Sequence, residues 1–309
     1  MQRMIVVAGE ALIDRIVRPD GSAIEVPGGS PFNTARTIAR LGTAVAFLGC
    51  LSTDSLGARL RHALAEDGVD LALVRTSDAP TTVALAGVDA AGVASYRFLA
   101  DGTSAPELDD AAVAAALALP PSALALGSLG LVLEPMADAL ADGVARCPFG
   151  TLVAVDPNCR PSAIPDRAAY RARLQGVLRR ADLVKVSTDD LAYLWPDLPA
   201  TVATGRILDL GPAAVLVTDG PGPVAAHARD FAFTVEVPAT EVVDTVGAGD
   251  AFGGAFLARW IGRGFGRDEL SDAASLRDAV VLAVEVARLT CRRPGADPPW
   301  RRELAWPPD

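Results

Sequence analysis

The stretch DTVGAGDAF, residues 244–252, combines two glycines, two alanines and two carboxylates. Apolar side chains with helical spacing follow at Phe252, Phe256 and Leu257, so the stretch leads into a helix. The free N–H groups and the dipole of a helix N-terminus favour an anion, and phosphate is the usual ligand of such a glycine-rich turn. Asp250 nevertheless directly follows the last glycine of the turn. A negative charge beside a phosphate site needs a chemical reason.

Two common phosphate-binding patterns do not fit this stretch. Gly247, Gly249 and Gly253 are spaced G-x-G-x-x-x-G, late in the chain, which differs from the dinucleotide-binding fingerprint. The G-K-[ST] ending of a P-loop is missing as well. A glycine-rich turn that binds no ligand stays open as the alternative.

Composition limits the partners of this chain of 309 residues. The formal net charge of −10 argues against nucleic acid, because binding to a phosphate backbone needs a basic face. No apolar run reaches membrane-spanning length without a charge, Gly or Pro. The N-terminal segment MQRMIVVAGEALID predicts a first buried strand rather than a signal peptide. We therefore expect a cytoplasmic protein with no membrane partner.

Cysteine and histidine chemistry is also disfavoured. The four cysteines form no C-x-x-C pair, and only two histidines are present. A zinc site, a disulfide framework and histidine catalysis are therefore not expected. The chemistry has to rely on carboxylates, backbone amides and cations. Lys185 is the only lysine among 28 basic residues, and it is either a functional residue or a chance surface lysine.

Strand and helix patterns alternate along most of the chain. Short apolar runs predict buried strands over residues 4–9, 44–52, 123–129, 151–156, 182–186 and 213–218. Amphipathic spacing predicts helices over residues 31–42, 55–69, 134–146, 167–180, 188–195 and 201–210. This alternation predicts an α/β fold with a mostly parallel central sheet that helices cover on both faces. No linker divides the chain, so we expect one domain over residues 1–309.

Two segments interrupt this alternation. Residues 12–29 and 81–100 have alternating strand patterns around polar turns, and neither has room for a helix. Both are predicted to be hairpins. We expect them to form a small sheet that projects from the main body as a lid.

Two sequence signatures resemble the ribokinase-like (PfkB) carbohydrate kinases. The family's D-T-x-G-A-G-D signature matches DTVGAGD, and its G-G-x-x-x-N element leading into a helix matches GGSPFNTARTIARLG, residues 28–42. The resemblance extends over nearly the whole chain, through GEALID, GCLSTDSLGARL, VDPNCRP, LVKVSTDD, VTDGPGP and RRPGADPP. It implies a ribokinase-like three-layer α/β fold with a β-sheet lid.

The resemblance also gives Asp250 a chemical role. It implies that Asp250 is the general base, which accepts the proton of a sugar hydroxyl as that oxygen attacks the γ-phosphoryl group. The amides of Gly247, Ala248 and Gly249 would form the anion hole for the phosphoryl oxygens. An aspartate that merely caps the helix is the alternative.

The sugar site is implied by further matching positions. Family positions that bind the sugar correspond to Asp14, Gly28, Gly29 and Asn33. Asn158 and Arg160 would face the phosphates or the sugar, and Arg97 would contact the substrate from the lid. Alternatives stay open for three of them: Asp14 as a turn residue, Asn33 as a helix cap and Arg97 as a surface salt-bridge partner.

The nucleotide and metal positions follow from the same resemblance. The implied nucleotide-binding residues are Lys185, Ser187, Thr218, Gly220, Gly222 and Thr245. The family usually carries N-x-x-E near the metal-bound nucleotide, where this chain has STDD, so Asp190 would contact Mg²⁺ through water. Asp244 and the carbonyl of Val246, with the loop around Gly295, match a K⁺ site of many members.

The resemblance predicts an ATP-dependent kinase that phosphorylates the primary hydroxyl of a sugar. Its cofactors would be ATP and Mg²⁺, with K⁺ as an additional ion, and a homodimer through the lid is a further expectation. The opening GEALID and the later segment GGSPFN are most similar to fructokinases and 2-keto-3-deoxygluconate kinases, then ribokinases. A catalytically inactive sugar- or nucleotide-binding paralogue is the alternative from another class.

Overall fold

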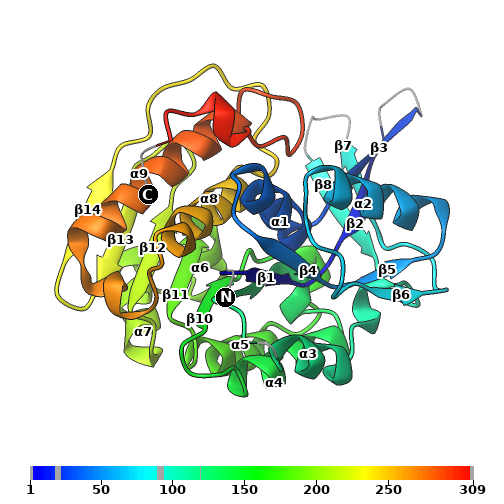
Figure 1. The fold of residues 1–309 in the computed structure, drawn as a ribbon, viewed down its shortest axis with the longest axis horizontal. Coiled ribbons are helices and arrows are strands. Elements are labelled where there is room, and N and C mark those ends of the chain that lie inside the picture. The colour runs from blue at the N-terminus through cyan, green and yellow to red at the C-terminus, as the bar shows by residue number, and fades with distance from the viewer. Residues whose placement is uncertain (1–2, 18–21, 89–93, 119, 307–309) are drawn as a thin grey trace.

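A computed structural model describes residues 3–17, 22–88, 94–118 and 120–306. Its largest feature is an eight-stranded sheet in the order β14-β13-β12-β11-β10-β9-β1-β4 (Figure 1). The strands are β1 (Ile5–Ala8), β4 (Val45–Leu48), β9 (Ala123–Gly127), β10 (Leu152–Asp156), β11 (Leu183–Ser187), β12 (Ala214–Thr218), β13 (Val224–Ala228) and β14 (Ala232–Val235). All pairings from β4 to β12 are parallel, and β13 and β14 are added antiparallel. The predicted mostly parallel sheet is confirmed.

Helices cover both faces of this sheet, which makes three layers (Figure 1). One face carries α1 (Ser30–Arg40), α2 (Ser55–Glu66), α8 (Ala248–Gly262) and α9 (Ala273–Thr290). The other carries α3 (Asp110–Leu117), α4 (Met136–Ala145), α5 (Arg167–Leu178), α6 (Thr188–Leu194) and α7 (Ala200–Leu210). Successive side chains of one strand, such as Val6 and Val7, enter opposite cores, which is why these strands are apolar throughout. Within the described ranges, no helix is both long and apolar enough to cross a bilayer.

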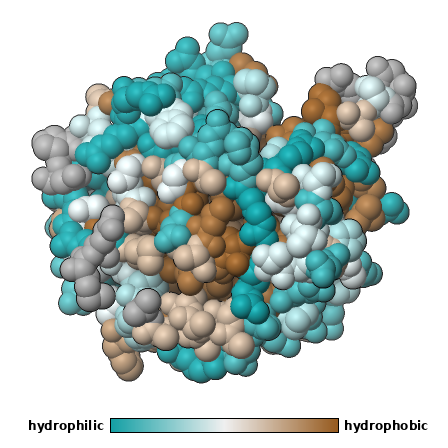
Figure 2. Space-filling model, turned by 45° about the vertical axis from the view of Figure 1, so that its right-hand side comes forward, coloured by the Kyte–Doolittle hydropathy of each residue, from teal (hydrophilic) through white to brown (hydrophobic). Residues whose placement is uncertain are grey.

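A second, four-stranded sheet projects beside the main body (Figures 1 and 2). It consists of β2 (Leu12–Val17), β3 (Ala23–Gly28), β7 (Val83–Val88) and β8 (Ala94–Leu99). The pairs β2–β3 and β7–β8 are antiparallel, and β2 pairs with β7 in parallel. Both predicted hairpins are present, while the tips of their turns lie outside the described residues. The role of this small sheet as a lid stays a prediction.

The strand predicted over residues 44–52 is two strands. β4 ends at Leu48, and β5 (Cys50–Ser52) pairs instead with β6 (Arg75–Ser77) in a separate two-stranded sheet. Gly49 lies between them, where a Cβ atom would approach the carbonyl oxygen of Gly9 to 2.7 Å. The chain leaves the large sheet at this crowded position. The sequence patterns also missed α3, α9, β13 and β14.

Candidate active site

A cavity of about 730 Å³ lies at the carboxyl edge of the large sheet. Residues of the small sheet line one side, and the first turns of α1 and α8 line another. The predicted site residues that line it are Asp14, Gly28, Gly29, Asn33, Asn158, Arg160, Ser187, Asp190, Asp244, Thr245, Val246, Gly247, Gly249 and Asp250. The fold thus gathers residues from both ends of the chain at the edge where open parallel sheets bind ligands.

Asp250 lies in the first turn of α8, and its side chain is buried. The Ser30 hydroxyl donates to its Oδ1 at 2.6 Å, and the Asn33 amide nitrogen donates to its Oδ2 at 2.9 Å. Both donors come from the start of α1, so the two helix N-termini meet at this carboxylate. Each carboxylate oxygen still has lone pairs for a further bond. The geometry fixes Asp250 while leaving it able to accept a proton.

Asn33 contacts Asp250 and also lines the cavity. Its amide nitrogen gives one N–H to Asp250 and keeps a second, so sugar binding by Asn33 stays a prediction. Its carbonyl Oδ1 is buried and has no hydrogen-bond partner among the described residues. Ser30, which the sequence analysis did not single out, shares this positioning of Asp250. The signal was present in GGSPFN, because the first residues of a helix often offer side-chain hydroxyls.

The glycines of the turn before α8 allow close approach. Gly247 has φ of 76°, and a Cβ there would lie 2.4 Å from Cβ of Ala296. A Cβ on Gly249 would lie 2.9 Å from Nζ of Lys185. Of the three residues predicted to form an anion hole, Gly247 and Gly249 line the cavity. Ala248 does not, and its N–H donates to the carbonyl of Thr245 at 3.2 Å. The anion hole stays a prediction.

Lys185 forms a buried ion pair with Asp156, Nζ to Oδ2 at 3.0 Å. Burial raises the pKa of Asp156 to about 6, against the opposing attraction of Lys185. Burial would lower the pKa of Lys185, but the carboxylates of Asp156, Asp190 and Asp250 outweigh it and raise that pKa. The only lysine is thus an ammonium group, placed behind the glycine turn rather than in the main cavity. The sequence patterns did not predict that Asp156, in VDPN at the end of β10, pairs with Lys185.

Asp14 lies on the face of the small sheet that lines the cavity, with Ile16, Val26 and Phe98. The strand register explains this grouping, because Asp14 pairs with Val26 and Ala84, and Ala84 pairs with Phe98. Burial and the charge of Asp250 raise the pKa of Asp14 to about 6, while Arg160 opposes that shift. This wall offers one carboxylate set among apolar side chains.

Arg97 lies on the face of the small sheet that points away from the cavity. It pairs with Leu85, which pairs with Arg15, so these three residues occupy the face of the small sheet opposite Asp14. Its side chain is exposed and does not line the cavity, whereas the next residue, Phe98, does. Arg97 and Phe98 differ in this way because successive side chains of a strand point to opposite faces.

Arg160 and Asn158 follow β10 and line the cavity near Asp14. The guanidinium of Arg160 donates to the carbonyls of Cys159 at 3.2 Å and of Asn158 at 3.4 Å. No described carboxylate forms an ion pair with it. Asn158 has φ of 39°, a left-handed conformation that Asn tolerates better than most residues. Arg160 is therefore a cation available to a ligand.

Asp190 and Ser187 form a capping box at the start of α6. Oδ2 of Asp190 accepts from the N–H and the hydroxyl of Ser187, at 2.9 and 2.6 Å, and Oδ1 accepts from the N–H of Cys159 at 2.6 Å. In the described part of the chain, no group of three or more Asp, Glu, His or Cys could hold a metal ion directly. Contact of Asp190 with Mg²⁺ through water stays a prediction.

Asp244 joins two loops at the rim of the cavity. Its Oδ1 accepts from the N–H of Val246 at 3.0 Å, and its Oδ2 accepts from the N–H of Gly295 at 2.8 Å. The loop around Gly295 is therefore adjacent to Asp244, as the resemblance implied. K⁺ binding by Asp244 and the Val246 carbonyl stays a prediction.

The remaining nucleotide positions lie beside the cavity rather than in its wall. Thr218 ends β12 and pairs with Ser187, which does line the cavity. Gly220, with φ of 52°, and Gly222 belong to the turn that follows. This turn is tied to α6 by the bond from the Thr188 hydroxyl to Asp219 at 2.7 Å. Nucleotide binding by Thr218, Gly220 and Gly222 stays a prediction.

Known carbohydrate kinases resemble this chain in sequence and in fold. Residues 2–302 match the pfkB family of carbohydrate kinases. The chain is 31% identical to fructokinase-1 of Oryza sativa subsp. japonica, over 96% of this chain and 94% of that relative. It is 30% identical to a fructokinase of Rhizobium leguminosarum bv. trifolii, over 82% of this chain and 79% of the relative. The crystal structure of the Xylella fastidiosa fructokinase with bound ATP matches with a TM-score of 0.88 at 28% identity, covering 96% of this chain and 94% of that one.

The fold and the comparisons together define the class of protein as a phosphotransferase with an alcohol group as acceptor. The chain belongs to the pfkB family of carbohydrate kinases. It is a sugar kinase similar to the fructokinases, with the ribokinase-like fold that the sequence predicted.

Proposed function

We propose that this protein is an ATP-dependent fructokinase, which transfers the γ-phosphoryl group to a primary hydroxyl of D-fructose with Asp250 as general base. The observation that carries the proposal is the position of Asp250, which faces the cavity from the N-terminus of α8 and is held by Ser30 and Asn33. A carboxylate in this place can take the hydroxyl proton while the helix N-terminus stabilises the phosphoryl oxygens. The fructokinases among the relatives support the choice of sugar.

In this mechanism the two walls of the cavity have different tasks. Asp14 accepts hydrogen bonds from sugar hydroxyls and directs the reacting hydroxyl toward Asp250. Asp250 removes the proton as the oxygen attacks phosphorus. The amides of Gly247 and Gly249, backed by the Lys185 ammonium, stabilise the charge on the transferring group. Catalysis is thus mainly positioning and electrostatic stabilisation.

The residues present fit an Mg²⁺ ion that arrives with ATP. Mg²⁺ keeps several waters and binds to one or two carboxylates together with substrate phosphates. Asp189 and Asp190 line the cavity, and both oxygens of Asp190 are already engaged, so water-mediated contact suits them. The ion would supply positive charge to the phosphates. K⁺, held by Asp244 and the Val246 carbonyl, would act from behind the same turn.

A panel of acceptors tests the proposal. Formation of ADP from Mg·ATP is measured with D-fructose, ribose, 2-keto-3-deoxygluconate and adenosine. We expect the highest kcat/KM for fructose, and a kcat about 10²–10⁴-fold lower for Asp250→Asn with every acceptor that the native protein turns over. Preference for another acceptor would change the proposed substrate but leave the assignment as a kinase intact. Sugar or nucleotide binding without turnover by the native protein would instead support the inactive paralogue.

One observation favours a second candidate, a 2-keto-3-deoxygluconate kinase. Arg160 is a cation in the sugar part of the cavity and forms no ion pair with a described carboxylate. A guanidinium in this place could bind the carboxylate of an acid sugar. In the same panel of acceptors, the Arg160→Gln variant distinguishes the two candidate functions. It should lower kcat/KM for the acid sugar by at least about tenfold, as expected for a lost charge-assisted bond, and affect fructose less.

The homodimer through the small sheet is also a proposal. Val17 and Leu99 lie on the same face of this sheet and are each more than a third exposed, and apolar side chains exposed together on one face can mark a protein interface. Light scattering of the purified protein measures the oligomer directly. Val17→Asp together with Leu99→Asp should convert a dimer to a monomer, and an unchanged mass would exclude this face as the interface.

A further inference from the structure

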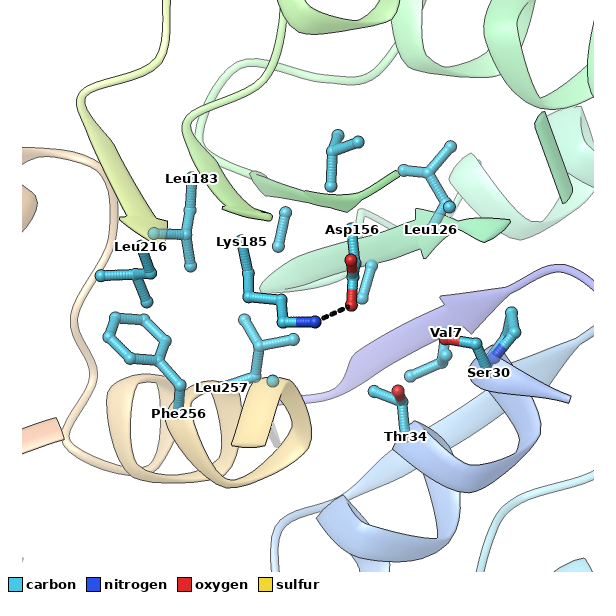
Figure 3. Close-up of a pocket in the computed structure, with 16 residues that line it drawn as sticks. Val7, Ser30, Thr34, Leu126, Asp156, Leu183, Lys185, Leu216, Phe256 and Leu257 are labelled. Carbon is cyan, nitrogen blue, oxygen red and sulfur yellow. Dashed lines mark hydrogen bonds and ion pairs between the residues drawn. The ribbon is translucent and has the colours of Figure 1, made fainter. Parts of the chain in front are cut away.

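A smaller cavity of about 50 Å³ lies between the large sheet and helices α1 and α8 (Figure 3). Figure 3 shows Lys185 and Asp156 on one side of it and Ser30 and Thr34 of α1 on another. Leucine and phenylalanine side chains form much of the remaining wall. Ser30 lines the main cavity as well, so the two cavities meet at the residue that donates to Asp250.

The polar end of this cavity suits water. Oδ1 of Asp156 is buried and has no hydrogen-bond partner among the described residues, while Oδ2 is bound to Lys185. The hydroxyls of Ser30 and Thr34 and the Lys185 ammonium offer further donors and acceptors. A water needs roughly 10–15 Å³ of such volume and two to four polar partners, so about three waters fit.

Gly253 supports the same conclusion from α8. It lies inside the helix and lines the small cavity, and a Cβ added to it would meet no atom within 4 Å. Glycine is less favourable than alanine in a helix interior. Its φ is not in the left-handed region, so neither crowding nor backbone conformation requires glycine here. The missing side chain leaves open the space in which the waters would lie.

We propose that this cavity holds a short chain of ordered waters that carries the proton taken up by Asp250 to Asp156. Protonated Asp250 gives its proton to Oγ of Ser30, and Ser30 passes its own hydroxyl proton to the first water. Each water hands one proton on, and the last protonates the unpartnered Oδ1 of Asp156. The net change is one proton moved from Asp250 to Asp156, which leaves Asp250 ionised; no other bond is altered.

The proposal rests on Asp250 as the general base, and Gly253 provides its test. Gly253→Ala places a methyl group among the waters without removing any polar group. We expect the steady-state kcat to fall by at least about fivefold, because Asp250 must lose its proton before each new turnover. This is less than the 10²–10⁴-fold expected for loss of the base itself. Gly253→Ser has nearly the same volume, and its hydroxyl can replace a displaced water, so its rate should stay within about twofold of wild type.

Gly205→Ala in α7 is the matched control, because a Cβ there also meets nothing within 4 Å and the site is distant in the fold. It should leave the rate unchanged. A Gly253→Ala rate equal to that of Gly205→Ala overturns the relay, as does a high-resolution crystal structure with no water on Oδ1 of Asp156. If Asp250→Asn is inactive in that case, the proposed function stands and only the relay fails. If Asp250→Asn is active, both the proposed role of Asp250 as general base and the relay are wrong.

Discussion

The two walls of the main cavity differ in how their charges are held. At the α1–α8 wall, Asp250 accepts two hydrogen bonds, and behind the glycine turn of this wall Lys185 is paired with Asp156. At the small-sheet wall, Asp14 lies among apolar side chains, and among the described residues Arg160 donates only to backbone carbonyls. The first wall is organised before any ligand binds, as transition-state stabilisation requires. The second leaves its charged groups available, so it is the wall that can adapt to a particular sugar.

The largest effect should come from the organised wall. Asp250→Asn keeps the size of the side chain but cannot accept the hydroxyl proton, so we expect kcat to fall about 10²–10⁴-fold. ATP affinity, measured by calorimetry, should weaken by less than roughly tenfold, or become tighter as a repulsive charge disappears. Asp272→Asn is the control, because Asp272 caps α9 through the N–H of Ser275. A kcat above about a tenth of wild type would reduce Asp250 to a similar cap.

Lys185→Met should lower the free energy of unfolding in addition to any effect on the rate. It leaves the buried Asp156 without its cation, and breaking such a pair costs about 3–5 kcal/mol in the free energy of unfolding. The pKa of Asp156 is already raised in the folded state, so the loss should grow as pH rises from 5 to 8 and be relieved by protonation at low pH. Urea denaturation at both pH values measures it. Arg229→Met, at an exposed arginine, should show neither effect, and equal stabilities of the two variants would refute the buried pair.

A smaller effect is expected at the small-sheet wall. Asp14→Ala should raise the KM for the sugar by about 10- to 150-fold, because a hydrogen bond to a charged group contributes roughly 1.5–3 kcal/mol. The KM for ATP should change little. Arg15→Ala is the matched control, since Arg15 is the next residue and lies on the opposite face, paired with Glu25. If both KM values rose together in Asp14→Ala, Asp14 would be structural.

The smallest effect concerns pH. The pKa of Asp14 is raised to about 6 by burial and by Asp250, and Arg160 opposes this rise. The ionised carboxylate accepts sugar hydroxyls, so kcat/KM for the sugar should fall as pH drops below about 6. Arg160→Gln removes the opposing charge, which should move this fall to higher pH. A pH profile of kcat/KM that is the same in both proteins would show that Asp14 does not control binding.

The sequence was informative wherever function depends on a local turn. DTVGAGD predicted Asp250 and the glycine turn, because a helix N-terminus, a left-handed glycine and a carboxylate are features of neighbouring residues. The alternation of strands and helices predicted the sheet for the same reason. Asp190 was predicted beside the metal, and the structure shows its oxygens engaged with Ser187 and Cys159. Its capping bond to Ser187 is local, whereas the bond from Cys159 depends on folding.

The contacts that no sequence pattern predicted join distant segments. Asn33 and Ser30 hold Asp250 across more than 200 residues of sequence. The face on which Arg97 lies was not predicted either, because a shift of one position along a strand reverses the direction of the side chain.

The sequence by itself determined the fold class, through the periodicity of its strands and helices, and the family, through two motifs of neighbouring residues. Only the tertiary structure decided which side chains complete the site. Asp156 meets Lys185 because β10 and β11 are adjacent parallel strands, and Ser30 meets Asp250 because α1 and α8 begin at the same edge of the sheet. Whether Gly253 borders open space is likewise decided by packing. Burial, register and helix placement are properties of the whole fold, and no local pattern encodes them.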